Sequence, residues 1–204
     1  MQSIIKTHLG SRTLADLLPR PRLLSQNAHN AVLIFAGSAI VALSAQIEIP
    51  LPLTPVPITG QTFGVLLVGT ALGWKRAAIS MLAYLLEGAA GLPVFAGGAA
   101  GIAKFAGPTA GYLFSFPLAA AVAGWLAERG WDRSPSRTFC AMLISSVPNL
   151  CVGMVFLSFY VGGLQRAFLM GVAPFILGDV IKASLASIAL PTAWKFANNP
   201  KHKQ

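Results

Sequence analysis

The sequence predicts an all-α membrane protein, and three observations support this fold class. Apolar residues make up 55% of the 204 residues, whereas charged residues make up only 10%. A soluble globular domain carries roughly 25% charged residues, so this chain has too little polar surface to cover a soluble fold of its size. The apolar residues are gathered into long runs, separated by segments that hold glycine, proline and basic residues. We therefore expect a bundle of six transmembrane helices.

The apolar runs give the expected crossings in order. They are Ala31–Ile49, Gln61–Leu72, Ala77–Ala90, Ala110–Leu126, Phe139–Val161 and Phe168–Trp194. A helix needs about 20 residues to span a bilayer, so the second and third runs must borrow length from their flanks. Those flanks, Pro50–Gly60 and Gly91–Gly107, are rich in proline and glycine. Irregular backbone at membrane depth must be satisfied by protein or by a water-filled cavity, so we expect both flanks to fold over a cavity.

The basic residues predict the orientation of the bundle. If the N-terminus is cytoplasmic, the cytoplasmic segments hold twelve of the fifteen basic residues: Lys6, Arg12, Arg20, Arg22, Lys75, Arg76, Arg129, Arg133, Arg137, Lys195, Lys201 and Lys203. The outer segments hold Lys104 and Arg166, and Lys182 lies within the sixth run. This bias favours cytoplasmic termini at both ends. Scattering of the positive charge between apolar runs also argues against a nucleic-acid partner.

The ends of the chain are expected to lie outside the membrane domain. The first 30 residues contain basic residues but no long apolar run near the start, which is unlike a cleavable signal peptide. We expect residues 1–30 to be a cytoplasmic leader, residues 31–195 to form the six-helix membrane domain, and residues 196–204 to be a cytoplasmic tail.

Asp179 and Lys182 place two opposite charges inside the sixth run. Each charge costs about 2.5–3.5 kcal/mol at the centre of an isolated membrane helix, so their presence needs a reason. Spacing i, i+3 puts both on one helix face, where they partly neutralise each other. One interpretation is a polar ligand held within the membrane, and the other is a structural ion pair that fixes helix packing.

Several enzyme and pump classes lack their characteristic residues here. The sequence contains no G-x-x-x-x-G-K-[ST], H-E-x-x-H or G-x-S-x-G motif, so ATP hydrolysis, zinc proteolysis and lipase-like chemistry are not indicated. Cys140 and Cys151 match no metal-ligand spacing, and we expect no metal or cofactor. Only Glu87 and Asp179 are candidate intramembrane acids, too few for a proton relay. Glu87 is a candidate ligand-binding residue, with snorkelling near the outer end of the third helix as the alternative. The chain is therefore expected to bind a ligand rather than to act as an enzyme.

Four segments resemble the BioY family, the biotin-specific substrate-capture subunits (S components) of energy-coupling factor (ECF) transporters. They are LPLTPVPITGQTFGVLLVG (Leu51–Gly69), YLLEGAAGLPVFAGG (Tyr84–Gly98), GPTAGYLFSFPLAA (Gly107–Ala120) and APFILGDVIKASLA (Ala173–Ala186). The resemblance extends over nearly all of Ala31 to Trp194. It implies a multi-pass protein of the cell (inner) membrane that captures biotin from outside. The implied partners are membrane lipid, a transmembrane coupling subunit and two cytoplasmic ATPase subunits.

The resemblance also gives the polar candidates a role in binding biotin. Asp179 would accept hydrogen bonds from the ureido N–H groups, and Lys182 would donate to the ureido carbonyl or to Asp179. Tyr84, Phe95 and Tyr112 would supply apolar walls.

Three further positions are candidates, and these and Tyr84 have open alternatives. The side-chain amide of Gln61, at the start of the second helix, would donate and accept hydrogen bonds with the ligand, or would instead form hydrogen bonds with nearby backbone groups. Gly97 and Gly98 would let backbone N–H groups approach a carboxylate, or serve as plain turn residues. Tyr84, one turn before Glu87, would contact the ligand or pack within the bundle.

The first helix offers an expected partner surface. Ser38 and Ala42, spaced i, i+4, place small residues on one face, where another helix can approach closely. That helix belongs either to the coupling subunit or to the bundle itself. Two other functions also fit the sequence: a stand-alone facilitator or channel for a small polar solute, and a membrane scaffold whose ion pair is structural.

Overall fold

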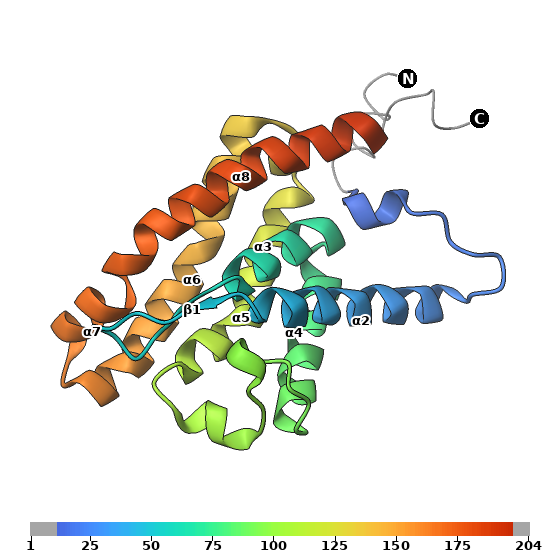
Figure 1. Cartoon of the computed structure of the whole chain (residues 1–204). Helices are drawn as coiled ribbons and strands as arrows, with labels where there is room; N and C mark the ends of the chain where they lie inside the picture. Colours follow the sequence, from blue (N-terminus) through green and yellow to red (C-terminus); the bar gives the residue numbers. More distant parts are fainter. Residues whose placement is uncertain (1–11, 198–204) are drawn as a thin grey trace.

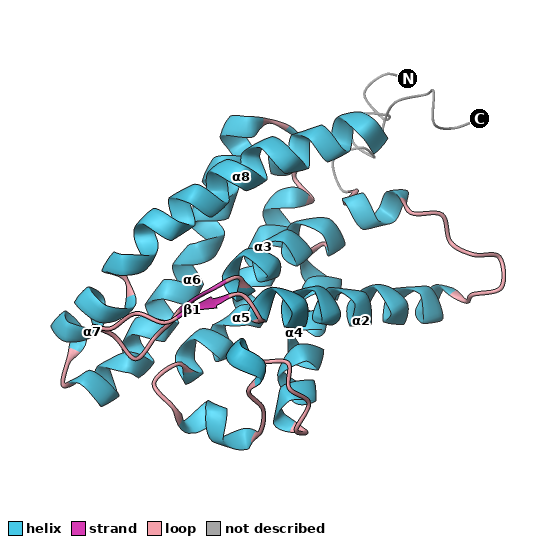
Figure 2. Cartoon of the chain, in the orientation of Figure 1, coloured by secondary structure: helices cyan, strands magenta, loops and turns pink. Residues whose placement is uncertain are grey.

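The computed structural model describes residues 12–197, which fold into a mostly helical bundle (Figures 1 and 2). The α-helices are α2 (Gln26–Ala45), α3 (Gln61–Leu72), α4 (Trp74–Ala89), α5 (Ala110–Ala127), α6 (Pro135–Val161), α7 (Leu164–Gly171) and α8 (Ala173–Ala197). Short 3-10 helices are η1 (Leu14–Leu17), η2 (Ala96–Gly98), η3 (Ile102–Ala106) and η4 (Trp131–Arg133). Strands β1 (Glu48–Ile49) and β2 (Ile58–Thr59) form an antiparallel hairpin.

The helices have the length and composition of a membrane protein. Within residues 12–197, four segments are long and apolar enough to cross a bilayer: α2, α5, α6 and the combined α7–α8 segment. α3 is apolar but has only 12 residues, or about 18 Å at 1.5 Å per residue. Many large apolar side chains on the outside of the bundle are exposed, such as Phe35, Leu86 and Phe159. The expected class, an α-helical membrane protein, is therefore confirmed.

α3 lies at the centre of the bundle and contacts α2, α4 and α5. Most of its residues are buried, including Val65, Leu66 and Val68. Gly69 allows α5 to approach closely, because a methyl group there would lie 2.7 Å from the carbonyl oxygen of Ala120. Small residues therefore determine the spacing between these two helices.

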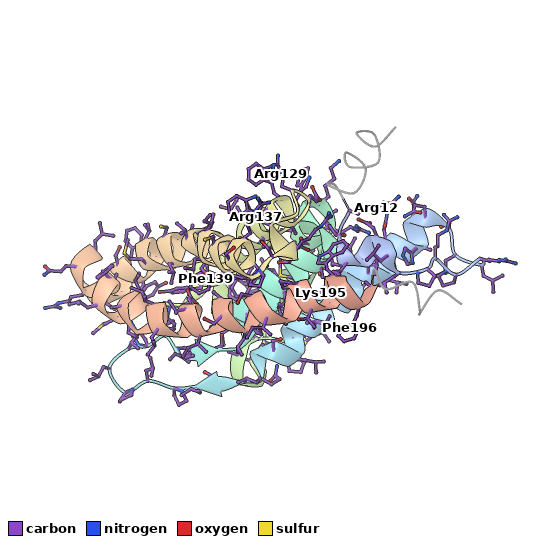
Figure 3. The ribbon with its side chains drawn as sticks, turned by 90° about the horizontal axis from the view of Figure 1, so that it is seen from above. Arg12, Arg129, Arg137, Phe139, Lys195 and Phe196 are labelled. Carbon is purple, nitrogen blue, oxygen red and sulfur yellow. The ribbon has the colours of Figure 1, made fainter. Side chains whose placement is uncertain are left out.

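One end of the bundle gathers the basic residues and the start of the described chain. Figure 3 shows Arg12, Arg129, Arg137 and Lys195 at this end. Gly73, with φ of +81°, makes the turn from α3 to α4, and the Glu128 carboxylate at the end of α5 accepts a hydrogen bond from the first amide of α4 at 3.1 Å. An acid at a helix N-terminus is favoured because it meets the positive end of the helix dipole. We call this the basic end.

The opposite end holds the connections that were expected to cover a cavity. The α2–α3 connection forms the β1–β2 hairpin, in which Glu48 pairs with Thr59, and the α4–α5 connection contains η2 and η3. Both connections line a cavity, as expected from their proline and glycine content. We call this the cavity end.

Several helix boundaries differ from the expected ones. α2 begins at Gln26, where the Ser25 hydroxyl caps it by accepting from the amide of Ala28, so the expected limit between residues 30 and 31 falls inside this helix. The first helix also ends at Ala45 rather than at Ile49, because the hairpin begins at Glu48. Parts of the expected leader and tail, residues 1–11 and 198–204, lie outside the described residues.

The expected sixth helix, Phe168–Trp194, is broken into α7 and α8. The break is at Val172, whose backbone angles of −124° and −57° leave helical geometry. The Tyr112 hydroxyl donates to the carbonyl oxygen of Gly171 at 2.7 Å, which satisfies a group that a helix end leaves without a partner. α8 thus starts at Ala173, close to the cavity.

Candidate ligand-binding site

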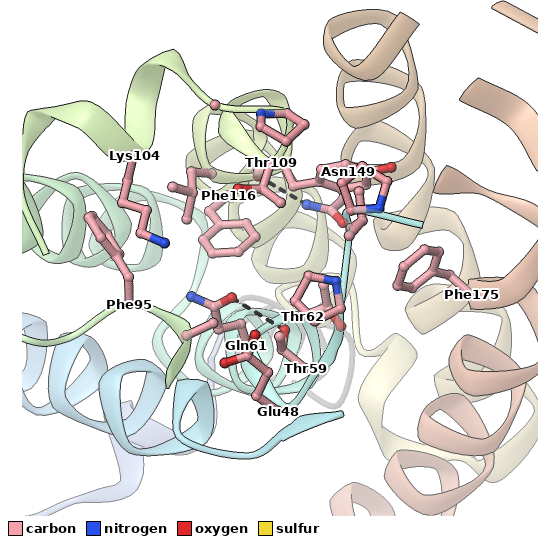
Figure 4. Close-up of a pocket in the computed structure, with 18 of the residues that line it drawn as sticks. Glu48, Thr59, Gln61, Thr62, Phe95, Lys104, Thr109, Phe116, Asn149 and Phe175 are labelled. Carbon is pink, nitrogen blue, oxygen red and sulfur yellow. Dashed lines mark hydrogen bonds between the residues drawn. The ribbon is translucent and has the colours of Figure 1, made fainter. Parts of the chain in front are cut away.

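A cavity of about 490 Å³ lies at the cavity end of the bundle (Figure 4). Its walls come from α3, α5, α6 and α8, and the hairpin and the η2–η3 connection cover it. The volume is within the usual range of 300–1,000 Å³ for small-molecule sites. Its lining includes the polar side chains of Glu48, Thr59, Gln61, Thr62, Lys104, Thr109, Asn149, Asp179 and Lys182.

Asp179 and Lys182 both line this cavity from α8. Their side chains are only 10% and 18% exposed, so both charges are largely removed from water. The Lys182 ammonium donates to the Thr62 hydroxyl at 2.6 Å and to the Thr59 carbonyl at 3.3 Å, and lies 3.9 Å from an Asp179 oxygen. Lys182 is therefore directed mainly towards α3 and β2. Because an ionised carboxylate offers about four lone-pair sites, Asp179 can accept hydrogen bonds from a ligand in the cavity.

Gln61 starts α3, is buried, and also lines the cavity. Its amide nitrogen donates to the Tyr84 hydroxyl at 2.6 Å, and that hydroxyl donates to the carbonyl of Val94 at 2.9 Å. The Thr59 hydroxyl donates to the Gln61 oxygen at 3.3 Å. This chain of hydrogen bonds orients the amide, which keeps a second N–H and a second lone pair for other partners.

Aromatic side chains form the apolar walls. Phe95, Phe116, Tyr112 and Phe175 line the cavity. Tyr84 does not: it is fully buried behind the wall, with its ring edge-to-face with Phe95 at 5.5 Å and tilted against Phe116 at 6.3 Å. Edge-to-face pairs are favourable contacts between aromatic quadrupoles. Tyr84 thus supports the wall and orients Gln61, while Phe95 and Tyr112 lie where a ligand can contact them.

Asn149 on α6 is a cavity residue that the sequence analysis did not identify. It is 6% exposed, and its amide nitrogen donates to the Tyr112 carbonyl at 3.1 Å and to the Ser115 hydroxyl at 2.7 Å. Both of its N–H groups are therefore used by α5, which leaves the side-chain oxygen as an acceptor at the cavity. The Pro148–Asn149 pair inside an apolar run was the signal that could have revealed it.

Glu48 and Lys104 add a second pair of opposite charges to the cavity lining, and the sequence analysis did not propose either as a site residue. Glu48 comes from β1 and Lys104 from η3. The signal for Lys104 was its position as the sole basic residue of the Gly91–Gly107 flank.

Three other candidates lie away from the cavity lining. Gly97 and Gly98, with φ of +65° and +71°, make the turn of η2, whereas their neighbours Ala96 and Ala100 line the cavity. Both glycines thus have the left-handed backbone that favours glycine. Glu87 on α4 accepts a hydrogen bond from the Ser38 hydroxyl on α2. Its carboxylate is therefore used between two helices.

Ser38 is 1% exposed and packs inside the bundle, so its hydroxyl contacts α4 rather than an outer surface. Of the two interpretations of the small residues on the first helix, bundle packing applies to Ser38. Ala42 is half-buried and also packs against the core.

The cavity provides hydrogen-bond donors, acceptors and aromatic walls, with opposite charges on α8. Within residues 12–197, no three His, Cys, Asp or Glu side chains lie close enough together to hold a metal ion. This arrangement suits a small molecule with an apolar body and several polar groups.

Comparisons with known proteins support one family. The family model described as the BioY family matches residues 17–199. "Biotin transporter BioY" of Thermotoga maritima is 40% identical over 162 residues, which cover 76% of this chain and 91% of that protein. The protein of the same name from Rhizobium etli is 42% identical over 160 residues, covering 74% of this chain and 85% of that protein.

A solved structure agrees with the sequence comparisons. It is the crystal structure of the S-component for biotin from an ECF-type ABC transporter, which matches with a TM-score of 0.72 and 27% identity over 84% of this chain and 95% of that chain. The resemblance inferred from the four sequence segments is confirmed: the chain belongs to the BioY family.

Proposed function

We propose that this protein is a membrane-embedded subunit that captures biotin from outside the cell and presents it for ATP-driven import. The observation that carries the proposal is the Asp179–Lys182 pair within an aromatic-walled cavity of about 490 Å³. Support also comes from relatives that are named biotin transporters. These relatives are transporters, in agreement with the prediction that the chain is not an enzyme.

The chemistry of the cavity complements that of biotin. Biotin has a ureido ring with two N–H donors and one carbonyl acceptor, an apolar thioether ring and chain, and a terminal carboxylate. Asp179 and the side-chain oxygen of Asn149 offer acceptors for the N–H groups, and Lys182 offers a charged donor for the carbonyl. Phe116, Tyr112 and Phe175 contact the apolar part. In this arrangement every polar group of the ureido ring finds a partner, as burial requires.

We propose six crossings, with α7 lying at the cavity end between the fifth and sixth. α3 and α4 are too short to span alone and are completed by the turn at Gly73 and by the connections at the cavity end. The basic residues at the opposite end support cytoplasmic termini, since cytoplasmic loops are enriched in Lys and Arg (Figure 3). Trp74 and Trp125, which are 42% and 47% exposed, also lie at helix ends at this basic end, as expected of residues at a membrane interface. The cavity then opens outward from the cell (inner) membrane.

We propose that import depends on a transmembrane coupling subunit and two cytoplasmic ATPases. The chain has no ATP-binding motif of its own, and the matched solved structure is described as a component of an ECF-type ABC transporter. The outer face of α2 beside Ala42, where Ala39 and Leu43 are exposed, is the proposed contact surface. Its small residues allow a partner helix to approach closely.

Reconstitution tests this division of labour. The purified chain in vesicles should bind biotin stoichiometrically, with thiamine and riboflavin as controls, and should not accumulate it against a gradient with or without ATP or a proton gradient. Adding the coupling subunit and the ATPases should produce ATP-dependent uptake. Concentrative uptake by the chain alone would refute the proposal. Rapid equilibration of biotin across the membrane without partners would instead support the facilitator alternative.

A further inference from the structure

Two lysines, Lys104 and Lys182, line the cavity, but they differ in the hydrogen-bond partners that the protein gives their ammonium groups. The Lys182 ammonium is bonded to Thr62 and Thr59 and lies near Asp179. In contrast, the Lys104 ammonium has no hydrogen bond or ion pair to any residue within 12–197. Lys104 is therefore the ammonium of the two whose donors are all left for a ligand, whereas Lys182 already shares its donors with Thr62 and Thr59.

Lys104 extends into the cavity from an anchored segment. Figure 4 shows its side chain reaching from η3 towards Gln61, between Phe95 and Phe116. The neighbouring Phe105 packs edge-to-face with Phe95 at 5.7 Å and lies against Phe114 at 5.3 Å. The Tyr160 hydroxyl on α6 donates to the Ala106 carbonyl at 2.7 Å. These contacts hold η3 against α5 and α6, so the position of Lys104 is defined by the fold.

Lys104 lies at the end of the bundle where this chain has few basic residues. Most basic residues belong to the opposite, basic end, and only Lys104 and Arg166 lie in the connections at the cavity end of the described chain. Arg166 does not line the cavity. A cation that departs from the general distribution and points into a cavity is best explained by an anionic group bound there.

Glu48 is the charge that opposes such binding, since it also lines the cavity. Its carboxylate lies against the backbone of η2: a methyl group added at Gly97 would be 2.5 Å from Oε2 of Glu48. Glu48 and Lys104 do not form an ion pair within 4.0 Å. Neutralising Glu48 should therefore strengthen the binding of an anion, whereas neutralising Lys104 should weaken it.

We propose that Lys104 binds the carboxylate of the ligand, so that the ligand lies with its ring at Asp179 and its carboxylate at η3. This inference rests on the proposed function and adds to it a determinant of specificity for the acid form. It assigns the carboxylate to a side chain on η3 and not to the backbone of Gly97 and Gly98, which do not line the cavity.

Paired ligands test the assignment. Biotin and biotinamide differ only at the carboxyl end, where biotinamide is neutral. Lys104→Met should weaken the equilibrium binding of biotin about fivefold, as expected for a partly exposed ion pair at the strong end of its range. The same variant should change biotinamide binding less than twofold. Lys104→Arg should retain most of the biotin affinity, and Glu48→Gln should raise affinity for biotin but not for biotinamide.

Matched controls separate this inference from the proposed function. Arg166→Met removes the basic residue of α7, which does not line the cavity, and should leave the binding of both ligands unaffected. Asp179→Asn should weaken biotin and biotinamide equally, because both carry the ureido ring. If Lys104→Met weakens both ligands equally or neither of them, the carboxylate assignment is wrong while the proposed function stands. If the unmodified protein binds neither ligand, the proposed function fails, and this inference fails with it.

Discussion

The Lys182 ammonium lies 2.6 Å from the Thr62 hydroxyl but 3.9 Å from the Asp179 carboxylate one turn away on the same helix. Lys182 thus connects α8 to the start of α3, and the two charges on α8 do not form a closed salt bridge. A buried pair of this kind is costly unless further hydrogen bonds compensate for the lost water. Hydrogen bonds to Thr62 and Thr59 replace the lost water for Lys182. Hydrogen bonds from a ligand's N–H groups would do the same for Asp179.

Asp179→Asn should weaken biotin binding by about 2–5 kcal/mol, because it replaces half of the acceptor sites by donors in a buried, charged contact. The thermal stability of the ligand-free protein should change less than its affinity for biotin. Isothermal titration and thermal unfolding of the same samples measure both quantities. Glu87→Gln is the matched control, because Glu87 is an acid of the same bundle that bonds to Ser38 outside the cavity. Loss of stability with unchanged affinity would instead identify Asp179 as structural.

Thr62→Val should weaken biotin binding by about 1.5 kcal/mol, the lower end for a hydrogen bond to a charged group, because Lys182 loses its nearest acceptor. Thr62→Ser keeps the hydroxyl and should bind normally. If Thr62 acts through Lys182, the double variant Thr62→Val, Lys182→Met should bind no more weakly than Lys182→Met alone. Additive losses would show that Thr62 contacts the ligand independently.

Tyr84→Phe should lower the free energy of unfolding by about 1–3 kcal/mol, since the carbonyl of Val94 loses its donor and the Gln61 amide loses its acceptor. Biotin affinity should fall less than stability, because Tyr84 lies behind the cavity wall. Tyr160→Phe provides the comparison: its hydroxyl also donates to a carbonyl, but the side chain is 52% exposed and water can replace it. A larger effect of Tyr84→Phe on affinity than on stability would place its hydroxyl at the ligand.

The docking of η1 at the basic end should depend on pH. Burial by itself raises the pKa of Asp16, but hydrogen bonds from the Thr13 amide and hydroxyl and the ion pair with Arg76, at 2.5 Å, outweigh burial and lower the pKa below its ordinary value of 3.8. A depressed carboxyl pKa contributes stability at neutral pH that is lost as the pH falls through the folded-state value.

Hydrogen exchange of the η1 amides, corrected for intrinsic rates, should therefore show protection at pH 7 that decreases below about pH 4. Asp16→Asn should lose this protection already at pH 7. Protection that persists in Asp16→Asn would show that η1 is held by its apolar contacts, such as those of the buried Ala15, and not by the ion pair.

Cysteine labelling should establish the orientation. In a background where Cys140 and Cys151 are replaced by serine, Ile102→Cys in η3 should react with an impermeant reagent from outside, because Ile102 is 75% exposed at the cavity end. Ser136→Cys, which is exposed at the start of α6 at the basic end, should react only after the membrane is permeabilised. The reverse pattern would invert the topology and place the cavity on the cytoplasmic side.

Much of the candidate site could be predicted from the sequence because its charged residues are conspicuous in apolar surroundings. Asp179 and Lys182 stand alone in a long run, and Gln61 follows a proline-rich segment. Phe95 and Tyr112 were predicted as wall residues because the motifs that contain them resemble those of the BioY family. Tyr84 shows the limit of this reasoning, because a motif places a residue near a site without showing whether its side chain faces the ligand or the core. Its hydrogen bonds to Gln61 and Val94 show that it faces the core.

The sequence by itself determined the membrane class, the apolar helices and the family, because these depend on composition, run length and the order of motifs along the chain. Only the tertiary structure decided that α7 and α8 separate at Val172, that Ser38 is bonded to Glu87, and that Asn149 and Lys104 reach the cavity from segments distant from α8. The direction of a side chain depends on how the helices rotate against one another and on where connections close over them. Those rotations follow from packing at residues such as Gly69 and Ala120, which meet only when the chain folds.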